Sequence, residues 1–108
     1  MTEILISRNK AREITGFTVS GHALFDKAGN DIVCAAISML TINTLNSIEE
    51  FLPDDKMIIN IDREDGKIEA RLHEKPSEGC TLLLNTFHLG MVSLEEQYGR
   101  KYVRVLES

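Results

Sequence analysis

Residues 21–38 read GHALFDKAGNDIVCAAIS, and they pass from a loop bounded by glycines into a long apolar run. From Ile32 to about Phe51, most residues are apolar or small. A helix that is apolar around most of its circumference is typical of a buried helix. The sequence therefore predicts a central, buried helix over residues 31 to about 51, with Cys34 in its first turn.

The position of Cys34 in that helix favours the ionised form of its thiol. The first helical turn has unpaired backbone N–H groups and the positive end of the helix dipole, and both stabilise a thiolate. A thiol, an imidazole from His22 and a carboxylate from Asp31 are the components of an activated nucleophile. Helical spacing also places one polar or small stripe on a single face: Asp31, Cys34, Ser38 and Thr41.

The same residues also have a purely structural interpretation. Cysteine is commonly a small, buried apolar residue, and Asp31 can serve only as the N-cap of the helix. His22 can equally be an ordinary loop histidine. The separation of a cysteine and a histidine along a chain is not specific, so the residues alone leave both interpretations open.

The joint motif is more specific than its parts. Residues 21–23 read GHA, a short glycine-containing loop follows, and residues 31–38 read DIVCAAIS. This arrangement resembles, without a gap, the signature of the ribosomal-processing cysteine proteases, a bacterial family, and the resemblance covers nearly all 108 residues. It implies that Cys34 is the nucleophile and His22 its partner, with Asp31 and Ser38 supporting the site.

The resemblance also implies a substrate and an assembly. Family members remove a short N-terminal extension from large-subunit ribosomal protein number twenty-seven, before or during ribosome assembly, and they form homodimers. Their substrates carry apolar and aromatic residues before the cleaved bond. We therefore expect a ribosomal protein precursor as partner. Apolar surface on the second helix is the expected contact between subunits.

The loop before the helix is the expected substrate-binding loop. Gly21 and Gly29 bracket it like hinges, which is typical of a lid that orders on substrate, although a plain connection between strand and helix would look the same. Its expected contact residues are Gly21, Ala23, Phe25 and Gly29. Phe25, together with the small pair at residues 35–36, is expected to line a pocket for the apolar substrate residues.

Two other functions use the same residues. A non-catalytic ribosome-assembly factor would bind the same precursor, with Cys34 and His22 serving only the structure. A redox-sensing domain would use the thiol of Cys34 alone. Alkylation of Cys34 and cleavage of a precursor peptide distinguish these functions from a protease.

Composition and charge fit one acidic globular domain. Apolar residues make up 43% and charged residues 27% of the chain, which is ordinary for a globular protein. A chain of 108 residues can form one core but not two, so we expect a single protease domain over residues 1–108. The net charge of −5 argues against direct nucleic-acid binding and suits a basic partner such as a ribosomal protein.

Targeting segments and cofactor sites are not expected. No apolar run approaches the roughly 20 residues that span a bilayer. Residues 1–10 lack the features of a signal peptide, so a cytoplasmic location without membrane association is expected. Cys34 and Cys80 should be reduced there, and no cysteine or histidine spacing suggests zinc, so no metal or cofactor is predicted. Cys80 falls on an apolar helical stripe and is predicted to pack in the core.

Patterning along the chain predicts seven elements. Two short strands pair as an antiparallel hairpin, in which Gly16 marks a bulge. Two alternating strands later flank Asp65-Gly66, a strong hairpin signal. Ser77 is the expected N-cap of a second helix. The strands are predicted at residues 2–8, 13–20, 57–62, 67–73 and 101–106. The order β-β-α-β-β-α-β predicts an α+β two-layer sandwich, in which two long helices cover one face of a largely antiparallel five-stranded sheet.

Overall fold

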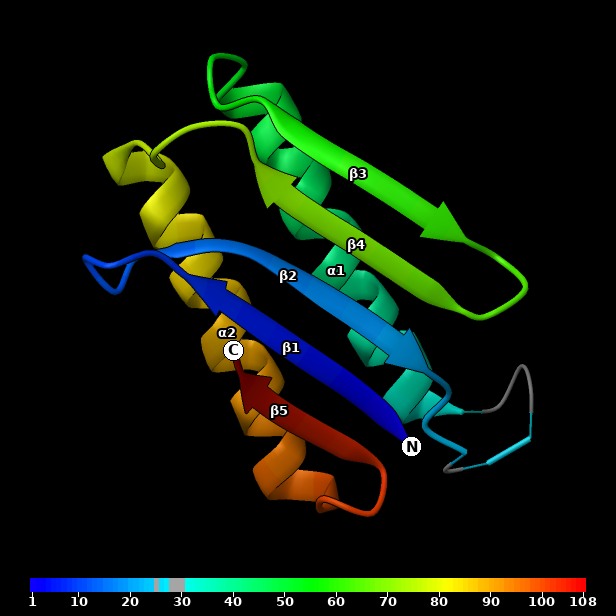
Figure 1. Ribbon diagram of the computed structural model, residues 1–108. Helices are drawn as coiled ribbons and strands as arrows, with labels where there is room; N and C mark the ends of the chain where they lie inside the picture. The colour runs from blue at the N-terminus through cyan, green and yellow to red at the C-terminus, as the bar shows by residue number, and fades with distance from the viewer. Residues whose placement is uncertain (25, 28–30) are drawn as a thin grey trace.

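Seven elements follow one another along the chain, and the computed structural model describes residues 1–24, 26–27 and 31–108. The sheet has the strand order β3-β4-β2-β1-β5, in which β1 and β5 are parallel and every other pair is antiparallel (Figure 1). The predicted α+β fold is confirmed. Its elements are β1 (Thr2–Arg8), β2 (Ile14–Gly21), α1 (Ile32–Phe51), β3 (Met57–Asp62), β4 (Lys67–Leu72), α2 (Glu78–Tyr98) and β5 (Val103–Glu107).

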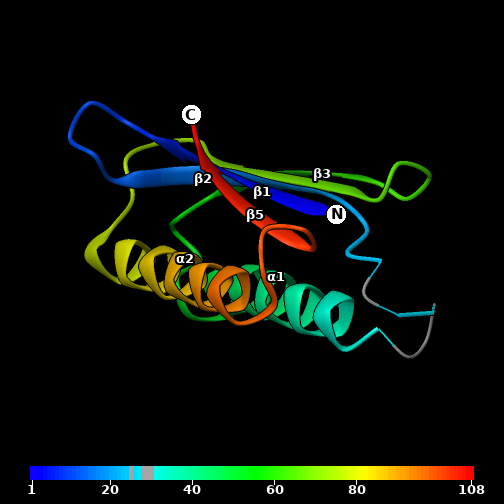
Figure 2. The same cartoon turned by 90° about the horizontal axis from the view of Figure 1, so that it is seen from below.

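The two helices lie on the same face of the sheet and run in opposite directions (Figure 2). The core fills the space between these two layers. At its centre the rings of Phe17 on β2 and Phe87 on α2 stack with their centroids 4.1 Å apart. The radius of gyration, 13.4 Å, is that of a compact domain of this length.

Three strands differ from the predicted bounds by one or two residues. The second strand is shifted by one residue, to Ile14–Gly21, and the fourth ends at Leu72. The last strand begins at Val103, two residues later than predicted. The reason is a closed turn, because the N–H groups of Tyr102 and Val103 both donate to the carbonyl oxygen of Gly99.

Gly16 lies beside an irregularity in the first hairpin, as predicted. Ser7 is opposite Gly16 but Arg8 is opposite Ile14, so the register shifts by one residue. A methyl group built on Gly16 would lie 2.5 Å from the carbonyl oxygen of Ala70 on β4. A larger residue would therefore push β2 away from β4.

The outer side of α1 corrects one prediction. Its inner side is buried through Val33, Ile37 and Ile48, but Met39 and Phe51 are 64% and 74% exposed. The prediction of a helix buried around most of its circumference was therefore wrong. The physical reason is that, within residues 1–24, 26–27 and 31–108, only the sheet and α2 cover α1, and the far side of the helix layer faces solvent.

The sequence predicted that no apolar run approaches the length that spans a bilayer, and α1 corrects that prediction. The helix has 20 residues, and an 18-residue stretch of it has a mean hydropathy of 1.4, so it is long and apolar enough to cross a membrane by length and composition alone. Such a helix is also typical of a protein core. In this protein α1 packs against α2 and the sheet.

Candidate active site

The first turn of α1 is fixed by Asp31. The carboxylate Oδ1 of Asp31 accepts the backbone N–H of Cys34 at 2.9 Å, and its carbonyl oxygen accepts the N–H of Ala35 at 3.0 Å. Asp31 is therefore the N-cap that the sequence predicted as one of its two possible roles. The cap holds Cys34 as the third residue of the helix, with its side chain half-buried.

The sulfur of Cys34 contacts the chain that follows β2. The backbone N–H of Ala23 donates to Sγ of Cys34 at 3.3 Å. Ala23 is 1% exposed, so this contact is shielded from solvent. The next residue, Leu24, has a φ of 58°, in the left-handed region that is uncommon for a bulky residue. The segment beside His22 is thereby joined to the start of α1.

Gly21 determines where His22 leaves the sheet. It is the last residue of β2 and has a φ of 88°, in the region that favours glycine. A methyl group built on it would lie 2.5 Å from the carbonyl oxygen of Met1. No other residue fits here without moving the N-terminal strand, and His22 follows directly with an exposed side chain.

His22 and Cys34 line one cavity of about 290 Å³. It lies at the end of the molecule where β2 ends, α1 begins and β3 turns into β4 (Figures 1 and 2). The structure records no hydrogen bond between these two described side chains. Catalytic hydrogen bonds often tighten only when substrate binds. The other lining residues are Thr2, Val19, Gly21, Ile37, Ser38, Thr41, Ile42, Ile61, Asp62, Arg63, Gly66, Lys67 and Ile68.

The polar stripe predicted on the helix largely faces this cavity. Cys34, Ser38 and Thr41 all line it. The hydroxyl of Thr41 donates to the carbonyl oxygen of Ile37 at 2.7 Å, whereas the side chain of Ser38 is exposed. Asp31 belongs to the same face of the helix, but its carboxylate caps the helix and is not part of the described cavity lining.

The predicted loop residues have different outcomes. Gly21 lines the cavity and Ala23 contacts the sulfur. Phe25 and Gly29 lie outside the described residues, and with them the predicted lid and its aromatic contact. The small pair at residues 35–36, expected beside Phe25, is absent from the described lining of the cavity.

The β3–β4 turn belongs to the site and was missed. Arg63, Gly66 and Lys67 line the cavity, although they lie far from the motif in the sequence. Only the strand order, which places β4 beside β2, brings the turn to His22. The single available signal was Asp65-Gly66, which marks a turn without indicating where it packs.

Cys80 has a different environment. It is fully buried on α2, as predicted for a core residue. Burial and, to a smaller extent, the nearby negative charge of Asp55 together raise the pKa of its thiol to about 11. Cys80 is therefore a protonated, enclosed thiol at neutral pH.

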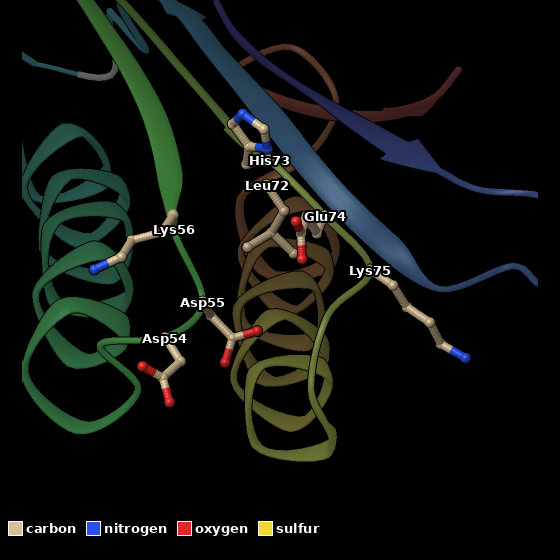
Figure 3. Close-up of a pocket in the computed structure, with 7 residues that line it drawn as sticks. All are labelled: Asp54, Asp55, Lys56, Leu72, His73, Glu74 and Lys75. Atoms are coloured by element: carbon tan, nitrogen blue, oxygen red, sulfur yellow. The ribbon is translucent and has the colours of Figure 1, made fainter.

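A second cavity, of about 340 Å³, is bordered mainly by charged side chains at the start of β3 and the end of β4 (Figure 3). Asp55 accepts the N–H of Ser77 at 3.0 Å and its hydroxyl at 2.6 Å, so it supports the N-cap of α2. Among the described residues, no group of three or more His, Cys, Asp or Glu could hold a metal ion. The motif residues are not part of this cavity.

Comparison with known proteins identifies relatives along the whole chain. The model of the family "Cysteine protease Prp" matches residues 1–104. The ribosomal processing cysteine protease Prp of two Staphylococcus aureus strains is 29% identical over 98 residues, which is 91% of this chain and 92% of the relative.

Solved structures agree with the sequence comparison. The S. aureus protease with a covalently linked product peptide is 26% identical, covers 100% of both chains and superposes with a TM-score of 0.93. The same protease with a substrate peptide is 25% identical, with a TM-score of 0.88 and the same coverage. The protein SMU.848 from Streptococcus mutans is 27% identical, with a TM-score of 0.81 over 100% of this chain and 99% of that one.

Proposed function

Since the chain belongs to the family of cysteine protease Prp, we propose that it removes the N-terminal extension of a bacterial large-subunit ribosomal protein, with Cys34 as nucleophile and His22 as general base. The observation that carries this proposal is the shared cavity, which presents a thiol at a helix start and an imidazole to the same space. Relatives from S. aureus were solved with a substrate peptide and with a covalently linked product peptide, which fits a nucleophilic cysteine.

The reaction proceeds through a thioester. His22 accepts the thiol proton of Cys34, and Sγ attacks the carbonyl carbon of the scissile peptide bond. The C–N bond then breaks as His22 returns the proton to the leaving amine, and the N-terminal extension stays on the sulfur. Water, deprotonated by His22, hydrolyses the thioester, and the proton returns to the thiol.

The N–H of Ala23 is the proposed donor to the oxyanion. The N–H of Cys34 is already engaged by the carboxylate of Asp31, and the N–H of Ala35 by its carbonyl oxygen. Ala23 N–H is directed at the sulfur from outside the helix, next to where the negative oxygen forms. When the sulfur bonds to the carbonyl carbon, this N–H passes from the sulfur to the oxyanion that forms beside it and stabilises the negative charge.

Asp31 and Ser38 support the site in different ways. Asp31 holds the first turn in place as its cap, which positions Cys34. Its negative charge opposes a thiolate, so its main contribution is geometric. Ser38 lies one turn further along the same face, where its exposed hydroxyl can hydrogen-bond the substrate backbone.

The lining of the cavity suits an apolar residue of the substrate. Ile37, Ile42 and Ile61 supply apolar surface, while Arg63 and Lys67 add charge at the β3–β4 turn. A cavity of about 290 Å³ has room for one or two side chains rather than a whole peptide. The family's preference for apolar and aromatic residues before the cleaved bond fits this lining.

The exposed apolar helix surface supports the proposed homodimer. Leu82 and Leu89 on α2 are 64% and 66% exposed, and Met39 on α1 is similarly open. Burial of apolar side chains between two copies would remove this surface from water. In this proposal residues 1–108 act as one protease domain in the cytoplasm, where the ribosomal protein precursor is made.

The direct test is cleavage of a peptide that spans the extension and the mature start of that ribosomal protein. The wild-type protein should release one N-terminal fragment, detected by mass spectrometry, and Cys34→Ala should release none. A peptide that binds but stays intact after long incubation with the wild type would favour the non-catalytic assembly factor. A thiol that oxidises reversibly, without cleavage, would favour the redox sensor.

A further inference from the structure

We propose that Gly66, in the turn between β3 and β4, is a positioning residue for the imidazole of His22. The inference rests on the proposed function. The observation behind it is a close approach, because a methyl group built on Gly66 would lie 3.0 Å from Nε2 and 3.2 Å from Cε1 of His22. The imidazole therefore rests against the backbone of this turn.

Two independent features favour glycine at this position. Its φ is 62°, in the left-handed region that residues with a side chain adopt at a cost. The ring of His22 also occupies the space into which a Cβ would project. Any other L-residue would be strained and would displace the ring by several tenths of an ångström.

The turn is attached firmly enough to act as a support. Asp62 Oδ1 accepts the N–H groups of Glu64 and Asp65, each at 3.1 Å, which closes the turn from within. Asp62 also pairs with Lys67 in the β3–β4 ladder. The support is thus continuous with the β3–β4 ladder and is closed by its own hydrogen bonds.

The sheet brings the support and the histidine together from two strands. Lys67 on β4 pairs with Ser20 on β2, so the turn ends beside the strand that leads to His22. The position of the Gly66 methyl group would also be 3.7 Å from the carbonyl oxygen of Gly21. The turn therefore lies against both Gly21, which directs the chain out of the sheet, and His22, which follows it.

The contact controls the orientation of the ring. The ring edge that carries Nε2 faces Gly66, which lines the same cavity as the sulfur of Cys34, so a shift of the ring away from this turn changes the position of its nitrogen in the cavity. Proton transfer depends on that geometry, and a displacement of about 1 Å can cost roughly 100-fold in rate. The charged groups that face the same cavity are Asp62, Arg63 and Lys67. Substitution of Gly66 by alanine neither adds nor removes a charge at the cavity.

The experiment compares Gly66→Ala with Gly99→Ala. Gly99 also has a positive φ, 95°, but a methyl group there would have no neighbour within 4 Å. Its substitution reports the strain alone, and that strain is at least as large. We expect Gly66→Ala to lower kcat for the precursor peptide by about tenfold with KM changed less than about twofold, whereas Gly99→Ala keeps the wild-type kcat.

Two further measurements separate positioning from loss of stability. The NMR signals of the His22 ring and the pH profile of Cys34 alkylation should both change in Gly66→Ala and remain unchanged in Gly99→Ala. Equal kinetics, ring signals and alkylation profiles in the two variants would overturn the proposal. If Gly66→Ala fails to fold, Asp62→Ala is compared with Asp62→Asn. Both remove the charge that faces the cavity, but only Asp62→Ala removes the acceptor of the Glu64 and Asp65 N–H groups and loosens the turn. Asp62→Ala should then shift the ring signals and lower kcat relative to Asp62→Asn, and identical behaviour of the two would overturn the proposal.

The proposal and the proposed function can fail separately. If the wild type cleaves the precursor and Gly66→Ala cleaves it equally well, the function stands and the positioning role falls. If the wild type cleaves nothing, yet only Gly66→Ala shifts the ring signals and the alkylation profile, the contact is established and the proteolytic function falls.

Discussion

The two helices begin in the same way at opposite ends of the molecule (Figures 1 and 2), yet only the start of α1 borders the proposed active site. In each, the N-cap side chain accepts the N–H of a cysteine three residues later: Asp31 that of Cys34 at 2.9 Å, and Ser77 that of Cys80 at 3.1 Å. Both sulfurs therefore experience the same helix dipole.

The surroundings of the two sulfurs differ. Cys34 is half-buried beside a cavity and accepts the N–H of Ala23, whereas Cys80 is 0% exposed and has a pKa raised to about 11 by burial. The start of a helix is therefore not sufficient to activate a thiol. Access, a second donor and a neighbouring imidazole are also needed.

Removing each sulfur in turn has the largest expected effect. Cys34→Ala should reduce cleavage of the precursor peptide by at least about 10³-fold, because the covalent step is lost. Cys80→Ala should keep kcat within about threefold of the wild type, since Cys80 lies outside the cavity, although its unfolding free energy falls. Steady-state kinetics and circular dichroism measure both effects. Cleavage by Cys34→Ala at the wild-type rate would place the nucleophile elsewhere.

Removing each of two exposed imidazoles gives the next largest difference. His22→Ala should lower kcat by about 10²- to 10⁴-fold between about pH 6 and 9, because general acid–base catalysis is lost. His73→Ala, an exposed histidine on the rim of the second cavity, is the matched control and should keep the wild-type kcat. Near-normal turnover by His22→Ala across this pH range would remove His22 from the mechanism.

Alkylation compares the two thiols directly in one sample. At pH 7, iodoacetamide should modify Cys34 more than about 100-fold faster than Cys80, because Cys80 is enclosed and protonated. Peptide mapping by mass spectrometry measures both rates. In denaturant the two cysteines should react at similar rates. Equal rates in the folded protein would contradict the contrast between the two helix starts.

The raised pKa of Cys80 predicts a pH dependence of stability. Between about pH 9 and 11 the unfolded state loses the thiol proton that the folded state keeps, so the free energy of unfolding falls as pH rises. The fall should reach about 2 kcal/mol in the wild type relative to Cys80→Ala. Urea unfolding of both proteins at several pH values measures it, and parallel curves would disprove it.

The caps should give the smallest effect. Asp31→Ala and Ser77→Ala should each lower the free energy of unfolding by about 1 kcal/mol, because each leaves the N–H of a helical turn without its acceptor. Asp31→Asn is the control, since it keeps an acceptor without the charge. It should restore most of that stability and keep kcat within about tenfold of the wild type. A larger loss of kcat in Asp31→Asn would show that the carboxylate also orients His22.

Local patterns predicted the fold, and they predicted the half of the candidate site that lies on one stretch of chain. Asp31, Cys34 and Ser38 were found because helical spacing fixes which residues share a face. The cap at Ser77 and the irregularity at Gly16 were likewise local features with a single physical cause.

Contacts set by the strand order were not predictable. The approach of Gly66 to His22 requires β4 to lie beside β2, and a sequence pattern does not reveal which strands become neighbours. The exposed outer side of α1 was missed for a related reason. The apolar character of Met39 and Phe51 favours their burial, but it does not show whether residues of this chain or of another copy would cover them.

The central claim is that the sulfur at the start of α1, and not the one at the start of α2, carries the acyl group. The most direct measurement is to mix the protein with the precursor peptide, quench in acid within the first turnover and map the adduct by mass spectrometry. We predict a thioester of the N-terminal extension on Cys34. Release of the product with no adduct on Cys34, or an adduct on Cys80, would contradict the account.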